Sequence, residues 1–243
     1  MTNVKTIILK FAGPLQSWGT NSHFETRHTD FHPSKSAVIG LLAAALGYRR
    51  DDDRYIQKLN EINFAIRVDQ PGNLLRDYHT ARKYKENGSF DRTYVTNRYY
   101  LEDAVFVAAL SHEDDTFMES IGEGLRYPYF QLFMGRRALP VCFDFFLQTN
   151  SDEIIDSLSQ FDWQAAEWYM RKQRKQFVTL ELYADAHLLG KAAHNLRKDR
   201  VLSLSQTERK FGVRYEARIN IEVLNQYASA NNTEHNAWDS IGD

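Results

Sequence analysis

The chain has 243 residues, of which 43% are hydrophobic and 26% charged, so it can bury the core of one large or two small globular domains. Its formal net charge of −2 argues against a general polyanion binder, whose surface would be strongly basic. The single cysteine, Cys142, excludes a disulfide framework or a cysteine-based zinc site within the chain, and the longest apolar run, residues 37–46, is too short to span a bilayer.

The first elements are indicated by apolar runs and by the residues that end them. Residues 4–11 form a β-branched and aromatic run ended by Gly13-Pro14, which predicts a strand and not a signal peptide. Further on, Ser34 precedes an alanine- and leucine-rich run that Gly47 closes. This pattern predicts a buried helix over 35–46 with an N-cap serine and a C-terminal glycine. The lone cysteine and the absent signal sequence favour a reducing, cytoplasmic location.

The remaining elements follow from hydrophobic periodicity and turn residues. In chain order we predict a polar loop at 20–33, a short helix at 51–60, strands at 64–68 and 74–80, a hairpin across 81–100 around Asn87-Gly88, a strand at 104–110, a helix at 114–125, a strand at 142–147, a helix at about 152–172, and strands near 176–184, 186–190, 200–205 and 213–223. The Asn-rich chain from Ser229 is expected to be disordered. This order matches an α+β, ferredoxin-like β-α-β-β-α-β unit with a protruding hairpin.

Charge is distributed unevenly along the chain. The stretch from Arg76 to Arg98 contains six basic and three acidic residues, and the stretch from Lys191 to Arg218 contains eight basic and three acidic residues. A third basic cluster consists of Arg171, Lys172, Arg174 and Lys175, whereas acidic residues concentrate at 51–53, 102–103 and 113–115. Such segregation suits one anion-binding face and one face turned away from it, although any single cluster can also be ordinary solvated surface.

The loop Gly13 to Gly19, with Gln16, Ser17 and Trp18 inside it, is a candidate phosphate site. Its glycines let backbone N–H groups approach a ligand closely. The predicted helix that begins at Lys35-Ser36 adds unpaired N–H groups, a positive dipole end and a full charge. The alternative is a glycine turn and a capped helix without a ligand.

Two further segments combine cations with aromatic rings. Arg136-Arg137 lie between Gly135 and Pro140, where they could clamp phosphates, or pair with a carboxylate such as Asp144. The predicted hairpin interleaves cations and rings in a pattern that suits a single-stranded nucleic acid, although hairpin tips are often simply solvated. Its residues of this kind are Arg82, Lys83, Tyr84, Lys85, Arg92, Tyr94, Arg98, Tyr99 and Tyr100.

Candidate catalytic groups are few. Metal-free RNA cleavage needs a general base and a nearby acid or cation, and Tyr78-His79 beside Arg82-Lys83 is the best local candidate. His187 and His194 are badly spaced for a metal, and neither a phosphate-binding Walker loop nor a nucleophile elbow is present. We therefore expect no metal ion, no cofactor and no catalytic residue.

These segments together resemble a known family. Leu9 to Gly19, then Pro33-Ser34-Lys35-Ser36 and Gly40 to Gly47, resemble the N-terminal signature of the CasD family, a subunit of the type I-E CRISPR surveillance complex Cascade within the RAMP superfamily. The resemblance covers most of the chain to about residue 147. It continues at Arg49-Arg50-Asp51-Asp52, Leu75 to Thr80, Tyr127-Pro128-Tyr129 and Gly135 to Pro140.

The resemblance implies a modified ferredoxin-like (RRM-like) RAMP fold with a hairpin thumb and a smaller C-terminal α/β part. We expect an RNA-binding domain at 1–147 with its hairpin insertion at about 81–100, a C-terminal portion at 148–225 packed on it, and a tail at 226–243. The implied function is a non-catalytic subunit that binds the 5′ handle of the CRISPR RNA and caps the backbone of the complex in antiviral defence. The implied partners are CasC backbone subunits, the large CasA subunit and, indirectly, target DNA, with no membrane.

A metal-independent endoribonuclease is the alternative, with Tyr48 or His79 as base. The related type I-C subunit cuts through a tyrosine near the end of the first helix and a Lys-His pair; Tyr48 could match the tyrosine, but this chain contains no Lys-His dipeptide. A purely structural scaffold is a third hypothesis. The first hypothesis assigns RNA contacts to Gly13, Gln16, Ser17, Trp18, Arg27, Lys35, Ser36, Arg76, Tyr78, His79, Arg82, Lys83, Arg92, Arg98, Arg136 and Arg137.

Overall fold

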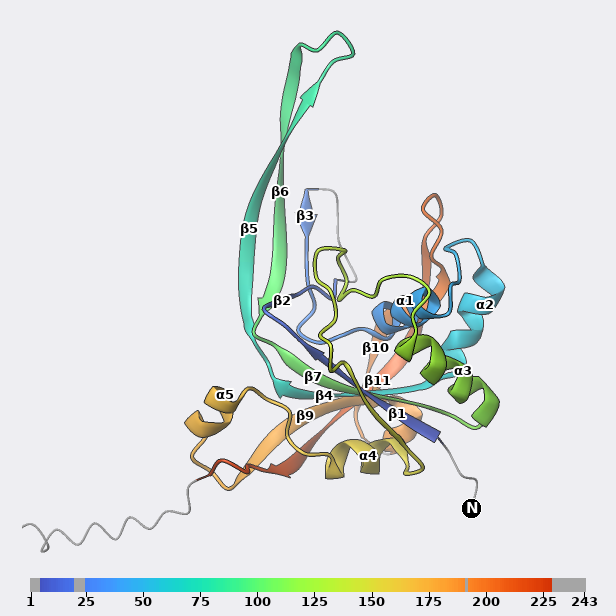
Figure 1. Ribbon diagram of the computed structural model, residues 1–243, viewed down its shortest axis with the longest axis vertical. Helices are drawn as coiled ribbons and strands as arrows, with labels where there is room; N and C mark the ends of the chain where they lie inside the picture. Colours follow the sequence, from blue (N-terminus) through green and yellow to red (C-terminus); the bar gives the residue numbers. More distant parts are fainter. Residues whose placement is uncertain (1–4, 20–24, 191, 229–243) are drawn as a thin grey trace, which may run out of the picture.

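The computed structural model describes residues 5–19, 25–190 and 192–228. Figure 1 shows two sheets with helices around one of them. The strands are β1 (Lys5–Ala12), β2 (Leu15–Gln16), β3 (Thr26–Arg27), β4 (Asn63–Gln70), β5 (Asn73–Tyr84), β6 (Phe90–Glu102), β7 (Val105–His112), β8 (Phe146–Asn150), β9 (Phe177–Asp185), β10 (His194–Ser203) and β11 (Lys210–Leu224). The helices are α1 (Lys35–Ala45), α2 (Asp53–Lys58), α3 (Asp115–Arg126), α4 (Ile154–Gln160) and α5 (Glu167–Lys172), with 3-10 turns η1 (Leu59–Glu61) and η2 (Ala186–Leu189).

The main sheet has seven strands in the order β10-β11-β9-β4-β7-β1-β8. Strand β7 pairs antiparallel with both β1 and β4, so β1 and β4 run parallel on either side of it. This split β-α-β arrangement, with β8 beside β1, is the ferredoxin-like unit. The prediction of an α+β, modified ferredoxin-like fold with a protruding hairpin is confirmed. Strands β9 to β11 extend the same sheet beyond β4.

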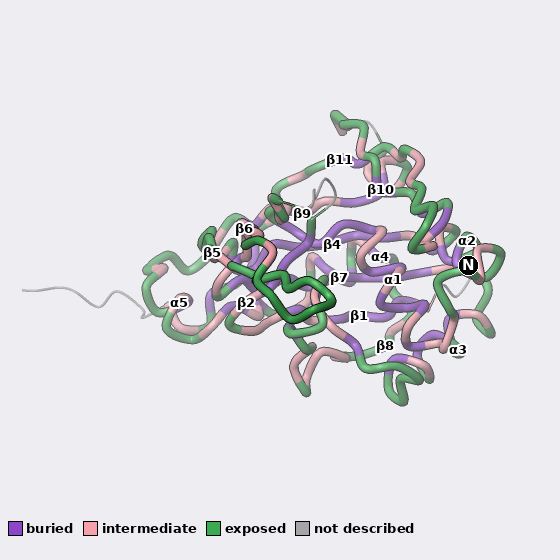
Figure 2. The backbone as a smooth tube through the Cα atoms, turned by 90° about the horizontal axis from the view of Figure 1, so that it is seen from above, coloured by how far each residue is buried: buried purple, intermediate pink, exposed green. Residues whose placement is uncertain are grey.

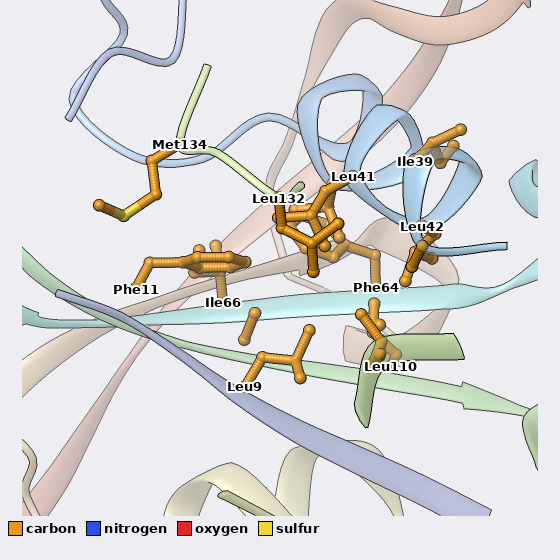
Figure 3. Packing of buried hydrophobic residues seen from close by; sticks show 14 of the residues in the cluster. Leu9, Phe11, Ile39, Leu41, Leu42, Phe64, Ile66, Leu110, Leu132 and Met134 are labelled. Atoms are coloured by element: carbon orange, nitrogen blue, oxygen red, sulfur yellow. The ribbon is translucent and has the colours of Figure 1, made fainter. Parts of the chain in front are cut away.

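Alternation along β1 divides the core into two layers. Ile7, Leu9 and Phe11 pack on the face covered by α1, α2 and α3, whereas Ile8 packs on the opposite face with Leu158 of α4. Figure 3 shows the first layer, in which Ile39, Leu41 and Leu42 of α1 lie over the sheet. Each fully buried side chain of this kind contributes roughly 1.5–3 kcal/mol. In the described part of the chain no helix is long and apolar enough to cross a membrane.

The hairpin predicted around Asn87-Gly88 is confirmed, and it is longer than expected. Its strands β5 and β6 pair from Asn73↔Glu102 to Tyr84↔Phe90, so the strand predicted at 74–80 is the base of the same hairpin. Gly88 adopts a φ of +80° at the turn. The hairpin projects beyond the main sheet, and its tip is exposed (Figures 1 and 2).

Several C-terminal predictions were wrong. The strand predicted at 186–190 is the 3-10 turn η2, and the strand predicted at 142–147 starts only at Phe146. The helix predicted at 152–172 is two helices, α4 and α5. Arg67 donates hydrogen bonds to the Leu158 carbonyl in the last turn of α4 and to the Phe161 and Asp162 carbonyls just after it, where the helix is interrupted. At the predicted tail, Tyr227 packs against the cluster around Trp163, and residues 229–243 lie outside the described residues.

Arg67 is a buried charge that ties β4 to the segment between α4 and α5. Its side chain and that of Asp69 are both 0% exposed, and they pair through Nε–Oδ1 at 2.7 Å and Nη2–Oδ2 at 2.8 Å. The Asp69 carboxylate also accepts from the Gln164 backbone N–H at 2.6 Å. The guanidinium and the carboxylate are thus both hydrogen-bonded, to each other and to residues 158–164, on the central strand of the sheet.

We expect Asp69→Ala to lower the free energy of unfolding by about 3–5 kcal/mol, because it leaves the Arg67 charge buried without its partner. Urea unfolding measures the change. The control is Glu167→Ala, which removes the exposed partner of Arg171 and should cost at most about 0.5 kcal/mol. Equal effects of the two substitutions would contradict the structural role of the buried pair.

Candidate RNA interface

A groove with a volume of about 1000 Å³ opens between α1, the loop after α3 and the turn that joins β10 to β11. The apolar part of its lining, which we call the floor, includes the small residues Ala37, Gly40 and Ala44 of α1 together with Phe211. Ser17, Trp18 and Gly19 of the predicted phosphate loop form part of its wall. The groove is therefore assembled from segments that are far apart in the sequence.

The charge of this groove has one sign. Six arginines line it, and no aspartate, glutamate or lysine is among the described residues that do so. The six are Arg27, Arg49, Arg50, Arg136, Arg137 and Arg209. Arginine binds phosphate through several N–H groups at once, so this wall suits a polyanionic ligand.

Arg136 and Arg137 are adjacent but have different surroundings. The Nη2 of Arg136 donates to the backbone carbonyls of Arg27 and Tyr99, each at 3.1 Å, and its guanidinium lies 4.1 Å from the ring centroid of Tyr100. Arg137 is exposed, and its guanidinium makes no hydrogen bond or ion pair with the described residues. Arg136 thus joins the loop to the hairpin base, whereas Arg137 remains available to a ligand.

Gly135 places this arginine pair against the loop that contains Ser17. Its φ is +82°, and a Cβ added there would lie 1.7 Å from the Ser17 carbonyl oxygen. The Ser17 backbone N–H in turn donates to the Met134 carbonyl at 3.3 Å. Only glycine permits this close approach of the two segments.

Four residues assigned to RNA contact are buried, which corrects the prediction for the side chains of Gln16, Ser17, Trp18 and Lys35. Gln16 is 0% and Trp18 is 1% exposed. The Gln16 amide donates to the carbonyls of Phe11 and Ala104, and its oxygen accepts from the Trp18 indole N–H at 3.0 Å. Trp18 packs edge-on against Phe11 and cannot stack on a base without leaving the core. Gly13, the first residue of the loop, is not part of the groove lining, and the Ser17 side chain is buried.

The start of α1 also differs from the prediction. Ser34 caps the helix as expected, by accepting from the Ala37 N–H, and Ser36 lines the groove. Lys35, however, is only 7% exposed, and its ammonium group pairs with Asp185 at 2.9 Å. Its backbone N–H donates to Asp199 at 3.0 Å. An internal carboxylate thus occupies the helix N-terminus that the sequence offered to a phosphate.

The hairpin carries the other assigned residues away from the groove. Those on its exposed or half-exposed surface are Arg76, Tyr78, His79, Arg82, Lys83 and Arg92. Only its base approaches the groove, where Arg98 pairs in register with Arg27 of β3. The Nε of Arg98 and the Nη1 of Arg136 are buried and have no hydrogen-bond partner among the described residues. A bound anion or water would satisfy them.

Sequence reasoning missed four groove residues. Arg49 and Arg50 follow α1, Arg209 lies in the β10–β11 turn, and His28 stacks on Tyr99 with ring centroids 5.5 Å apart. The basic excess between 191 and 218 contained Arg209, but nothing in the sequence distinguishes it from Arg197 and Arg214, which the fold pairs with carboxylates.

The groove offers little catalytic chemistry. Tyr48 lines it, and burial, with a further effect of Tyr55, raises the pKa of the Tyr48 hydroxyl, which disfavours the tyrosinate that a general base requires. His79 lies on the hairpin, with Nδ1 3.4 Å from the Thr96 hydroxyl. No cluster of three potential metal ligands occurs among the described residues.

Comparison with known proteins agrees with this architecture. Residues 6–215 match a family described as CRISPR-associated protein (Cas_Cas5). Over 157 residues, covering 59% of this chain and 70% of the relative, the sequence is 35% identical to the CRISPR system Cascade subunit CasD of Escherichia coli (strain K12). A chain of a solved CRISPR RNA-guided surveillance complex superposes with a TM-score of 0.72 at 30% identity, covering 90% of this chain and 91% of that chain. A crystal structure of a Cas protein gives 0.60 at 26% identity, covering 91% and 96%.

The fold and the matched residues define a CRISPR-associated protein of the RAMP type. The chain belongs to the Cas5 family, and within that family it is CasD-like.

We expect Gly135→Ala to detach the loop that carries Arg136 and Arg137 from Ser17. The matched control is Gly88→Ala, since Gly88 has a φ of +80° but nothing within 4 Å of its added Cβ. The control should cost about 1–2 kcal/mol for the left-handed backbone alone, and Gly135→Ala about 1–3 kcal/mol more for the clash. Thermal unfolding of both variants tests this, and equal losses would refute the close contact.

Proposed function

We propose that the chain is a subunit of a CRISPR RNA-guided complex and that it binds the 5′ handle of the CRISPR RNA in the arginine-lined groove. The observation that carries the proposal is the all-arginine charge of that groove on a chain whose net charge is −2. A nonspecific polyanion binder would carry a strong positive net charge, whereas this chain gathers six arginines, and no described acidic residue, around one groove.

The groove chemistry suits an unpaired RNA strand. We infer that phosphates are neutralised at the wall by Arg49, Arg137 and Arg209. The floor of Ala37, Gly40 and Phe211 offers apolar surface to bases. Sequence-specific RNA recognition uses unstacked bases that are splayed into such surfaces. This arrangement supports the binding of a short single-stranded segment such as a handle.

The similarity to CasD extends the proposal to partners. We propose contacts with CasC backbone subunits and the large CasA subunit, and an indirect connection to target DNA. We also propose that residues 1–147 carry the handle contacts and that 148–225 support them. The strands of the second part continue the sheet of the first, so the two parts share one core.

We propose that the subunit holds RNA without cutting it. The tyrosine at the end of α1 is present as Tyr48, but no Lys-His pair accompanies it, and the raised pKa of its hydroxyl opposes a role as base. An endoribonuclease activity is therefore the less favoured candidate.

Charge reversal at the groove tests the RNA-binding proposal. Arg137→Glu/Arg209→Glu should weaken binding of the handle RNA by at least about tenfold for each lost phosphate contact. Fluorescence anisotropy with a labelled handle oligonucleotide, and RNA retention in the assembled complex, measure this. Arg54→Glu/Lys58→Glu on α2, outside the groove, is the matched control. Loss of binding in the control alone, or in neither variant, contradicts the groove assignment.

Incubation of the purified chain with labelled CRISPR repeat RNA in EDTA tests the absence of cleavage. We expect intact RNA, since burial raises the pKa of the Tyr48 hydroxyl and no Lys-His pair accompanies it. Site-specific cleavage that is lost in Tyr48→Phe or His79→Ala would establish the endoribonuclease alternative.

A further inference from the structure

The basic cluster Arg171, Lys172, Arg174 and Lys175 has no part in the groove. It occupies the end of α5 and the loop that leads into β9. Figures 1 and 2 place α5 at the end of the molecule opposite α2 and α3. None of these cations lines the groove, so RNA bound there would not account for them.

Only one of the four cations is neutralised within the described chain. Arg171 pairs with Glu167 one turn earlier and lies 4.8 Å from the ring centroid of Tyr227. Lys172, Arg174 and Lys175 are exposed, and their side chains make no ion pair or hydrogen bond to a described residue. The end of α5 and the loop after it thus present three positive charges, within four residues, that no described residue compensates.

The backbone of the loop is held in one shape by a buried side chain. The Asn225 amide nitrogen is placed to donate to the carbonyls of Met170, Gln173 and Lys175 at 3.0, 2.5 and 3.2 Å. Asn225 is 2% exposed, and its own N–H donates to the Gln176 carbonyl at 2.8 Å. The cations therefore stand on a preorganised loop, which reduces the entropy lost when a ligand orders them.

Exposed aromatic side chains flank the cations in the sequence. Trp168 on α5 is 57% exposed and Phe177 at the start of β9 is 56% exposed. Tyr169 contacts Trp168 edge-on, with ring centroids 5.7 Å apart, and supports the indole from the core side. Large aromatic side chains left in water next to unpaired cations are the combination that binds unpaired bases and their phosphates.

We propose that the α5–β9 loop is a second binding surface for single-stranded nucleic acid, separate from the groove. Lys172, Arg174 and Lys175 bind phosphates, and Trp168 stacks on a base. Stacking and phosphate contacts do not read the 2′-hydroxyl, so the surface accepts RNA and DNA alike. The proposal does not rest on groove binding and stands if the handle lies elsewhere.

The test uses the full chain carrying Arg137→Glu/Arg209→Glu, so that groove binding does not mask the second surface. Fluorescent poly(U) RNA and poly(dT) DNA of equal length are titrated at several salt concentrations. Lys172→Gln/Arg174→Gln/Lys175→Gln should reduce the slope of log affinity against log salt by about 2 for both polymers, since each single-strand phosphate contact contributes about 0.7. Arg54→Gln/Lys58→Gln/Lys198→Gln removes the same charge away from the patch and should leave the slope unchanged.

Trp168→Ala separates stacking from charge. It should lower the affinity for both polymers by about tenfold with an unaltered salt slope. An unchanged slope in the patch variant, or a slope lowered equally by the control, overturns the proposal. Binding of polyglutamate but of neither polynucleotide also overturns it, in favour of an acidic protein partner.

Discussion

The buried ammonium group of Lys35 is the constraint on which the placement of the groove depends. A charge taken out of water must be paired and hydrogen-bonded to be tolerated. The Asp185 carboxylate that pairs with it also accepts from the Phe64 N–H, and Arg214 bonds both Asp185 and Asp199. These partners lie on β4, β9, β10 and β11, so the start of α1 is fixed to the C-terminal strands, and the helix presents Ala37, Gly40 and Ala44 to the groove.

His32 completes this network as a neutral side chain. Burial, together with the charge of Arg197, lowers its pKa to about 4. Its Nδ1 lies 3.2 Å from the Pro33 carbonyl and its Nε2 lies 3.1 Å from Arg197, so the neutral tautomer with Nδ1–H donates to the first and accepts from the second. Because the unfolded pKa is near 6.5, the histidine contributes less stability as the pH falls from there toward 4. The contribution of His32 to the stability of the fold is therefore complete at neutral pH and decreases in acid.

Local signals predicted the elements, and long-range partners decided what the side chains do. Ser34, Gly47 and Asn87-Gly88 act through neighbours within a few residues, which is why the first helix and the hairpin could be predicted. The sequence assigned Lys35 to a phosphate and not to Asp185. Asp185 lies 150 residues further along the chain, and no local pattern connects the two. Likewise, Trp18 is recognisable as buried only once Gln16 and Phe11 are known to hold it.

The same distinction explains how a chain of net charge −2 can present surfaces with uncompensated positive charge. Its cations fall into two populations. Lys35, Arg67 and Arg214 are neutralised by internal carboxylates and serve folding, whereas Arg137 and the cations of the α5–β9 loop have no such partner among the described residues. Composition counts both populations alike, although only unpaired cations attract a polyanion. The two proposed nucleic-acid surfaces therefore rest on the arginines and lysines that the fold leaves uncompensated, and the net charge of the chain does not reveal them.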